Sequence, residues 1–239
     1  MKIDILAFGA HPDDVELGCG GTLHKAVVNG KTVGIIDLTK GELGTRGDIK
    51  TRAIEASNAS KVLGVSFREN LEMSDGFLTN SKENQLLIIN MIRKCQPEIV
   101  FCNSFEDRHP DHSKASQLVR DSCFLSGLVK IITKDIDGNV QKFWRPNAVY
   151  SYIQWKSLKP EFVVDISSSI DVKISAVKCY KSQFYNPSSD EINTPISTKN
   201  FIESIRYRAA DLGRLTNLDY AEGFVSDRLI AVDSIFDIK

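Results

Sequence analysis

The sequence is poor in the residues that mark several large classes of protein. Its 239 residues include five cysteines, an odd number without a C-x-x-C pair, which excludes a disulfide framework and a thiolate zinc knuckle. Lys and Arg total 30 against 31 Asp and Glu, so no basic excess points to nucleic acid or an anionic membrane. No apolar run approaches the ~20 residues that span a bilayer. Histidine is scarcer still, with four in the chain.

The remaining composition is that of an ordinary globular protein, with 42% hydrophobic and 26% charged residues. The apolar start at residues 3–10 has a slight similarity to a signal peptide. Asp4 interrupts this run and His11 follows it at once, so a buried strand explains it better. We therefore expect a cytoplasmic protein in a reducing environment, with a core large enough to need no disulfides.

The first half of the chain alternates between apolar, strand-like segments and amphipathic, helix-like segments. Strands are predicted at 3–10, 32–39, 65–73 and 98–103, and helices at 14–29, 48–63, 82–95 and 110–125. This alternation is typical of βαβ units with right-handed crossovers. It predicts an α/β fold with a Rossmann-like, doubly wound, mainly parallel sheet whose first strands have the order 3-2-1-4-5.

The second half is less regular. Strands are predicted at 148–153, 162–166 and 223–232, helices at 171–184 and 199–212, and a Pro- and Ser-rich loop at 186–198. No internal repeat and no interdomain linker is evident. We therefore expect one domain over residues 1–239, with a Rossmann-like half at 1–126 and a C-terminal elaboration at 127–239.

Two similar motifs follow two of the predicted strands and contain three of the four histidines. H-P-D-D occupies residues 11–14 and H-P-D-H occupies residues 109–112. A proline disfavours helical geometry in the residue before it and suits the first turn of a helix, so each histidine should be extended and each aspartate should lie at a helix N-terminus. Strands one and four are neighbours in the predicted order. The motifs should therefore face each other across the crevice at the carboxyl ends of these strands, where such folds bind ligands.

The side chains of these motifs suit a catalytic metal site. Two imidazoles and a carboxylate form a common ligand set for zinc that leaves a fourth position for water. The candidate ligands are His11, Asp14 and His112. Asp13 then lies beside the metal in a suitable position for a general base. His109 is a candidate acid, with Asp111 as the carboxylate that orients it.

Several plainer interpretations compete with this one. Either motif alone could be a strand-to-helix turn with an aspartate cap. The glycine run at 18–21 comes too late after the strand for a dinucleotide site, so close helix–sheet packing explains it better. We interpret Cys19 as a small packed residue and His24 as surface or core filler. A receiver-like signalling module would also place paired carboxylates after the first strand, around Mg²⁺, but Mg²⁺ prefers oxygen ligands to imidazole.

The motifs and several further segments resemble the LmbE-like, or PIG-L, family of zinc-dependent N-deacetylases. The main matches are A-H-P-D-D at 10–14, G-E-x-G at 41–44 and H-P-D-H at 109–112. Further matches are T-R at 51–52 with Glu55, R-E-N-L at 68–71, D-G at 75–76, D-R at 107–108, K-S-Q-F at 181–184 and Y-A-E-G-F at 220–224. The resemblance is strongest to the bacillithiol-biosynthesis branch.

This resemblance implies the same metal ligands, with Asp13 as the base and His109 as the residue that stabilises the oxyanion or protonates the leaving amine. It implies that Arg52 and Asp75 contact the sugar. The substrate of that branch is N-acetylglucosaminyl malate. Arg108 is our candidate for binding the carboxylates of the malate group, because guanidinium binds carboxylate through paired hydrogen bonds. Glu42 and Arg46 are weaker candidates in the Gly-rich loop. Leu43 stands where relatives often carry an acidic residue, so this sequence departs from the family pattern at that position.

The implied reaction is hydrolysis of the acetamide of N-acetylglucosaminyl malate. The alternatives are another N-acetylglucosamine conjugate, a chitooligosaccharide, or a sugar-binding protein of the same fold that is not catalytic. The implied cofactor is Zn²⁺, although imidazole–carboxylate sites also accept Fe²⁺ and other divalent metals. The resemblance further implies a homo-oligomer, such as a hexamer, with no nucleic-acid or membrane partner.

Overall fold

The computed structural model describes residues 2–237, which contain a seven-stranded sheet of order β3-β2-β1-β4-β5-β7-β6. The strands are β1 (Ile5–Gly9), β2 (Val33–Thr39), β3 (Phe67–Met73), β4 (Ile99–Asn103), β5 (Ala148–Tyr152), β6 (Phe162–Asp165) and β7 (Ala221–Ser226). The helices are α1 (Asp14–Val28), α2 (Ile49–Leu63), α3 (Lys82–Cys95), α4 (Pro110–Ser126), α5 (Ile170–Val177) and α6 (Lys199–Arg214), with a short 3₁₀ helix at Ile235–Asp237.

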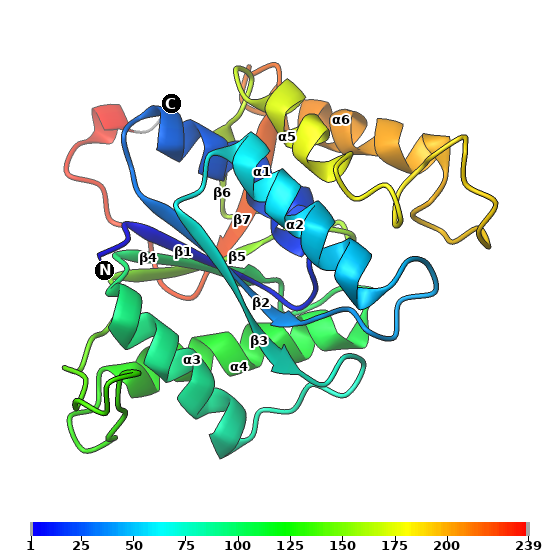
Figure 1. Ribbon diagram of the computed structural model, residues 1–239. Helices are drawn as coiled ribbons and strands as arrows, with labels where there is room; N and C mark the ends of the chain where they lie inside the picture. The colour runs from blue at the N-terminus through cyan, green and yellow to red at the C-terminus, as the bar shows by residue number, and fades with distance from the viewer. Residues whose placement is uncertain (1, 238–239) are drawn as a thin grey trace.

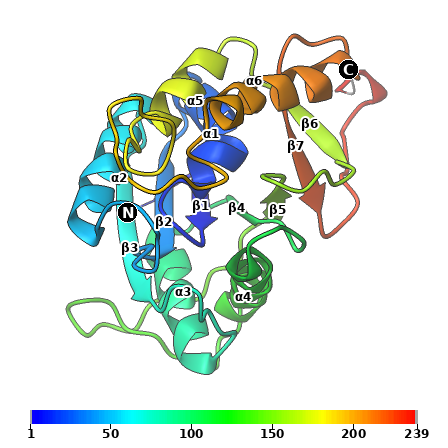
Figure 2. The same cartoon turned by 90° about the vertical axis from the view of Figure 1, so that its right-hand side faces the viewer.

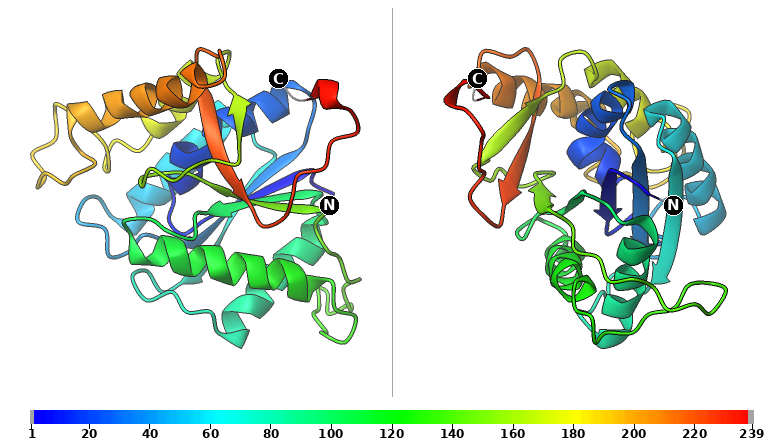
Figure 3. Two further views of the ribbon diagram at one scale, coloured as in Figure 1. Left: turned by 180° about the vertical axis from the view of Figure 1, so that it is seen from behind. Right: turned by 90° about the vertical axis from the view of Figure 1, so that its left-hand side faces the viewer.

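The strands β3, β2, β1, β4 and β5 form a parallel sheet, which confirms the predicted doubly wound order. The elaboration adds β7 antiparallel to β5, and β6 antiparallel to β7. Figure 3 shows these two strands at one edge of the sheet, with β3 at the opposite edge. The crossover connections place the helices in two layers, with α1, α2, α5 and α6 on one face and α3 and α4 on the other (Figures 1 and 2).

The central strand β1 is buried on both faces, as its continuous apolar run predicts. Ile5 and Ala7 pack into the cluster beneath α1, α2 and α5, whereas Leu6 and Phe8 pack into the cluster against α3 and α4. This alternation follows from the two-residue period of a strand. It fixes the carboxyl end of β1 between two cores, and the first H-P-D motif begins just beyond that end.

Helix α1 packs closely against its neighbours because of its glycines. A Cβ on Gly18 would lie 2.1 Å from the ring of Tyr152, and a Cβ on Gly21 would lie 2.9 Å from Ile166. These contacts agree with close packing and not with dinucleotide binding. Cys19 is fully buried, and all five cysteines are free.

Two predicted elements of the second half are shorter than expected. The helix predicted at 171–184 ends at Val177, and the chain then turns so that buried Tyr180 reaches Glu16, with 3.0 Å between the phenol oxygen and Oε1. The strand predicted at 223–232 begins earlier and ends at Ser226, whose hydroxyl donates to the carbonyl of Arg228. Leu229 beyond it is exposed, because an apolar run alone does not supply a strand partner. None of the described helices is long and apolar enough to cross a membrane.

Candidate active site

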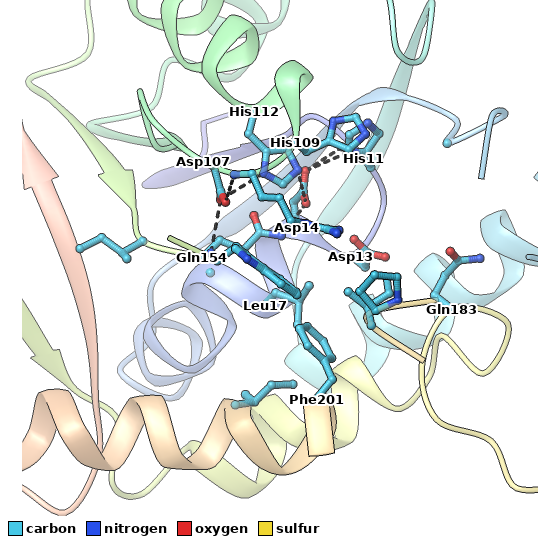
Figure 4. A pocket seen from close by; sticks show the side chains of 18 of the residues that line it. His11, Asp13, Asp14, Leu17, Asp107, His109, His112, Gln154, Gln183 and Phe201 are labelled. Atoms are coloured by element: carbon cyan, nitrogen blue, oxygen red, sulfur yellow. Dashed lines mark hydrogen bonds and ion pairs between the residues drawn. The ribbon is translucent and has the colours of Figure 1, made fainter. Parts of the chain in front are cut away.

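The two H-P-D motifs meet at the carboxyl ends of the neighbouring strands β1 and β4, as the topology predicted (Figure 4). The ring centroids of His11 and His109 are 4.6 Å apart, and those of His109 and His112 are 5.3 Å apart. The three imidazoles and Asp13 and Asp14 line one cavity of about 410 Å³. Segments that are remote in the sequence therefore form one site.

The backbone differs between the two motifs. Helix α4 begins at Pro110, and His109 is its extended N-cap residue. Helix α1 begins only at Asp14, so Pro12 lies outside it and the prediction of a proline in the first helical turn is wrong there. Asp13 is the N-cap residue, with a φ of 118° and no capping hydrogen bond from its side chain. Such a positive φ strains an aspartate backbone, and strain of this kind clusters at functional sites.

Asp14 links the two motifs. Its Oδ1 lies 3.1 Å from His112 Nε2, and its Oδ2 lies 3.4 Å from His11 Nδ1. Gln154 Nε2 donates to Oδ1 at 2.7 Å, and Asn103 Nδ2 donates to Oδ2 at 3.2 Å. Burial by itself would raise the pKa of Asp14, but the two histidines hold it well below its usual value. Asp14 is therefore an oriented carboxylate that stays ionised.

His11 presents its other nitrogen to two more carboxylates. Its Nε2 is 3.0 Å from Asp75 Oδ1 and 3.6 Å from Asp111 Oδ2. Burial would lower the pKa of His11, but Asp111, Asp14 and Asp75 raise it well above its usual value. Within the described residues, Nε2 is buried and has no hydrogen bond of good geometry. A buried nitrogen without a hydrogen bond, among carboxylates that favour positive charge, is suited to coordinate a metal cation.

The donor set fits a transition metal. Zinc binds nitrogen and oxygen at about 2.0–2.2 Å, which separates two tetrahedral ligands by about 3.3 Å, close to the Asp14–His112 distance. Among the described residues, two groups have ligand atoms within 4.8 Å of one another: His11, His109 and His112, and His11, Asp75 and Asp111. Asp14 belongs to neither group; its Oδ1 faces His112, and its Oδ2 faces His11. His11 belongs to both of these groups and to the predicted ligand set of His11, Asp14 and His112.

Asp13 lies beside this group and points into the same cavity (Figure 4). Its Oδ2 accepts a hydrogen bond from Arg52 Nη2 at 2.7 Å. The same guanidinium donates from Nε and Nη2 to the carbonyl of Pro12, which fixes it against the motif. Burial raises the pKa of Asp13 to about 7, and Arg52 only partly offsets this shift. Asp13 can therefore exchange a proton near neutral pH.

His109 is held differently from its sequence prediction. Its Nδ1 accepts a hydrogen bond from the backbone N–H of Asp111 at 3.2 Å, so a neutral ring carries its proton on Nε2. The prediction that the Asp111 carboxylate orients His109 is wrong, because this carboxylate accepts from the N–H of Gly76 at 2.6 Å and faces His11. Burial and the neighbouring His11 and His112 lower the pKa of His109.

The candidate substrate-binding residues divide into two sets. Arg52, Asp75 and Arg108 line the cavity, whereas Glu42 and Arg46 do not. Glu42 Oε1 accepts from the backbone N–H of Asp75 at 2.8 Å. Arg46 is buried and directed at the 186–198 loop, where Nε lies 3.3 Å from Glu191 and Nη2 donates to Ser189 at 2.7 Å. Its predicted role in substrate binding is therefore wrong, because its guanidinium already joins two loops.

Sequence reasoning missed the residues that hold the candidate metal ligands. Asn103 ends β4 and Gln154 follows β5, so both lie at carboxyl ends of parallel strands, the signal that could have found them. Asp107 holds His112, with Oδ2 3.2 Å from Nδ1. His24 is away from the cavity, with Nδ1 3.0 Å from the hydroxyl of Ser169. No sequence motif indicated that α6 would form the far wall of the cavity.

Comparisons with known proteins agree with this geometry. The family model described as "PIG-L: GlcNAc-PI de-N-acetylase" matches residues 6–123. The diacetylchitobiose deacetylase of Thermococcus kodakarensis is 30% identical over 191 residues, which cover 75% of this chain and 70% of the relative.

Two solved structures are similar over most of their length. The conserved protein TT1542 from Thermus thermophilus has a TM-score of 0.86 and 35% identity, with 97% of this chain and 98% of that chain covered. The N,N'-diacetylchitobiose deacetylase from Pyrococcus horikoshii, complexed with its inhibitor MPG, has a TM-score of 0.80 and 26% identity, with 93% and 83% covered. With its paired H-P-D motifs joined at one cavity, this chain belongs to the PIG-L family of deacetylases.

Proposed function

We propose that the protein is a metal-dependent N-deacetylase that hydrolyses the acetamide of an N-acetylglucosamine conjugate. The observation that carries this proposal is the position of Asp13, a desolvated carboxylate held by Arg52 beside a cluster of metal-ligating side chains. A protein that only bound sugar would have no use for a proton acceptor whose pKa lies near 7. Membership of the PIG-L family supports the same reaction.

The residues that would hold the metal are His11, Asp14 and His112. Zn²⁺ is the first candidate, and Fe²⁺ or another divalent transition metal suits the same donors. The chemistry that such an ion supplies when bound is Lewis acidity, which polarises a carbonyl group and lets water ionise near neutral pH. Gln154, Asn103 and Asp107 would keep the ligands oriented through the hydrogen bonds described above.

Asp13 would act as the general base. A water molecule attacks the acetyl carbonyl carbon, and its proton passes to the Asp13 carboxylate. Arg52 keeps this carboxylate turned toward the cavity and leaves the other oxygen, Oδ1, available to accept the proton. His109 would present its Nε2–H to the developing oxyanion. The C–N bond then breaks, and a proton from Asp13 or His109 passes to the nitrogen, which gives acetate and a free amine.

The first candidate substrate is N-acetylglucosaminyl malate. Arg108 supports it, because this exposed guanidinium lies at the cavity and is a suitable partner for a carboxylate. Another N-acetylglucosamine conjugate or a chitooligosaccharide is the alternative, which the diacetylchitobiose deacetylases among the relatives support. The protein would work as a homo-oligomer, such as a hexamer.

Acetate release across a substrate panel tests the proposal. The purified, zinc-loaded protein would be given N-acetylglucosaminyl malate, free N-acetylglucosamine and diacetylchitobiose. We expect the highest kcat/KM for the malate glycoside. Asp13→Ala should strongly lower release from every substrate while retaining the metal. No acetate from any member of the panel would refute the deacetylase, and a preference for diacetylchitobiose would refute the malate glycoside as the substrate.

A further inference from the structure

Helix α6 forms the wall of the cavity opposite α1. Its cavity-lining residues recur at the spacing of one helical face and are Phe201, Ile205, Arg208, Ala209 and Leu212. Figure 4 shows Phe201 rising from α6 toward Leu17, with the histidine group on the other side of Leu17. The face is apolar except for Arg208, a half-buried guanidinium in an otherwise hydrophobic wall.

Arg208 differs from Lys173 and Arg52, two other cations of the cavity, in having no ion pair within the described residues. Lys173 lies 2.5 Å from Glu222, and Arg52 lies 2.7 Å from Asp13. Among residues 2–237, the Arg208 side chain makes neither a hydrogen bond nor an ion pair. Burial lowers its pKa, which the field of Asp107 only partly offsets. The Asp107 carboxylate is already used by His112 and by two backbone N–H groups.

A second arginine, Arg108, lines the same cavity. The Arg108 guanidinium is 4.3 Å from the ring centroid of Trp155, and Trp155 stacks on Phe201 with ring centroids 5.4 Å apart. Phe201 is two turns before Arg208 on α6. Arg108 also follows Asp107 directly in the chain, and Asp107 is the acidic group whose field acts on Arg208. Both guanidinium groups therefore line the cavity that Trp155 lines, both lie in reach of the Asp107 segment, and neither makes an ion pair within the described residues.

We propose that Arg208, together with Arg108, binds an anionic group carried by the substituent on the sugar, and that this pair selects charged over neutral conjugates. The proposal rests on the proposed deacetylase function. A desolvated guanidinium without a partner is unfavourable, so its place in an apolar wall is explained when a ligand supplies the anion. Carboxylate and phosphate oxygens both match the donor fork of arginine. The apolar residues around Arg208 strengthen this contact by excluding water.

Three substrates distinguish the sources of the anion. They are the N-acetylglucosamine glycoside of a hydroxy acid, the methyl ester of the same glycoside, and N-acetylglucosamine 1-phosphate. The kcat and KM for acetate release would be measured for the zinc-loaded wild type, Arg208→Gln and Arg208→Lys. The control is Arg214→Gln, because Arg214 lies on the same helix outside the cavity and pairs with exposed Asp211 at 2.7 Å.

We expect the wild type to prefer an anionic substrate to the ester by about tenfold to a hundredfold in kcat/KM, the range of a charged hydrogen bond. Arg208→Gln should bring this ratio toward one, mainly through KM, and Arg208→Lys should retain part of it. Arg214→Gln should keep the wild-type ratio. The acid or the phosphate, whichever is preferred, identifies the anion.

Two results would overturn the proposal: equal use of the ester and both anions by the wild type, or an equal loss for all three substrates in Arg208→Gln with an unchanged melting temperature. Failure of the deacetylase function itself is distinguishable, because no substrate would then release acetate.

Discussion

The two H-P-D motifs share three letters and are held in different ways. In the second motif the helix begins at the proline, and the His109 ring caps it by accepting from the N–H of Asp111. In the first motif the helix begins two residues after the proline, and the Asp13 side chain caps nothing. The first motif therefore leaves a carboxylate free to face the cavity, whereas the second uses one imidazole nitrogen to hold its own backbone.

This difference separates the roles of the two aspartates. Asp13 is desolvated, and burial raises its pKa to about 7. Burial also raises the pKa of Asp111, but the adjacent His11 imidazole and the Gly76 N–H lower it to about 2. The same residue in the same triplet is thus a candidate base in one motif and a carboxylate of low pKa beside His11 in the other. The surroundings of each aspartate, and not its place in the motif, set its pKa.

The largest expected effects are on metal content and activity, and they distinguish the two histidines that open the motifs. His11→Ala and Asp14→Ala should lose the metal and all activity, because each would remove a ligand. His109→Ala should keep the metal and lose turnover by about 10²–10³, the loss found when one oxyanion donor is removed. Metal per chain after dialysis, measured by mass spectrometry, and acetate release would be compared for the three variants. Metal loss in His109→Ala with retention in Asp14→Ala would assign the three histidines as the ligands.

The next effect separates the two aspartates. Asp13→Ala should lower kcat by about 10²–10⁴ with the metal retained, as expected for loss of a general base. Asp111→Ala should act through His11 and lower metal affinity by about 10–100-fold, as other outer-shell partners of metal ligands do. A zinc titration of activity distinguishes them, since excess zinc should restore Asp111→Ala but not Asp13→Ala. Restoration of Asp13→Ala by zinc would contradict its role as the base.

Much of this arrangement could be predicted from the sequence because it depends on local patterns. The continuous apolar runs of β1 and β4 and the alternation of elements indicated the parallel sheet, and the sheet brought the motifs together. The position of Gln154 after a parallel strand could be predicted, but its contact with Asp14 could not, and neither could the place of Arg208 at the cavity. Their roles depend on contacts across the fold: Gln154 reaches Asp14 from just after β5, and Arg208 reaches the cavity from a helix of the irregular half.

Arg46 and Pro12 show the other limit of sequence reasoning. An arginine in a Gly-rich loop near the cleft suggested substrate binding, but Glu191, far away in the sequence, occupies its guanidinium. A proline after a strand suggested the first helical turn, but the carbonyl of Pro12 is held by Arg52, and the chain turns through Asp13 before α1 begins. In both cases a distant side chain overrides a local preference.

The helices that follow the motifs also differ, since α1 contains glycines where α4 has none. In Gly18→Ala, overpacking should lower the free energy of unfolding by about 1–3 kcal/mol. The higher helix propensity of alanine should offset ~1 kcal/mol of this loss. Tyr152 cannot move aside easily, because its hydroxyl donates to the carbonyl of Phe8 at 3.0 Å. Gly20→Ala is the matched control, because its Cβ would meet no atom closer than 3.7 Å and should stabilise the protein. Urea unfolding that ranked the two variants alike would show that α1 can shift away from β5.

The smallest expected effect is the difference in stability between substitutions of the two prolines. Pro110 is exposed at the first position of α4, so Pro110→Ala should cost about 0.4–1 kcal/mol, mainly through the entropy of the unfolded chain. Pro12 is buried between the strand and the strained Asp13, so Pro12→Ala adds a small cavity to the same entropy term. We therefore expect Pro12→Ala to have the lower midpoint in urea and, because the Pro12 carbonyl anchors Arg52, the larger loss in kcat. Equal midpoints and equal kcat values would mean that the backbone around Asp13 is fixed by the Arg52 contact alone, and that the difference between the two motifs does not depend on their prolines.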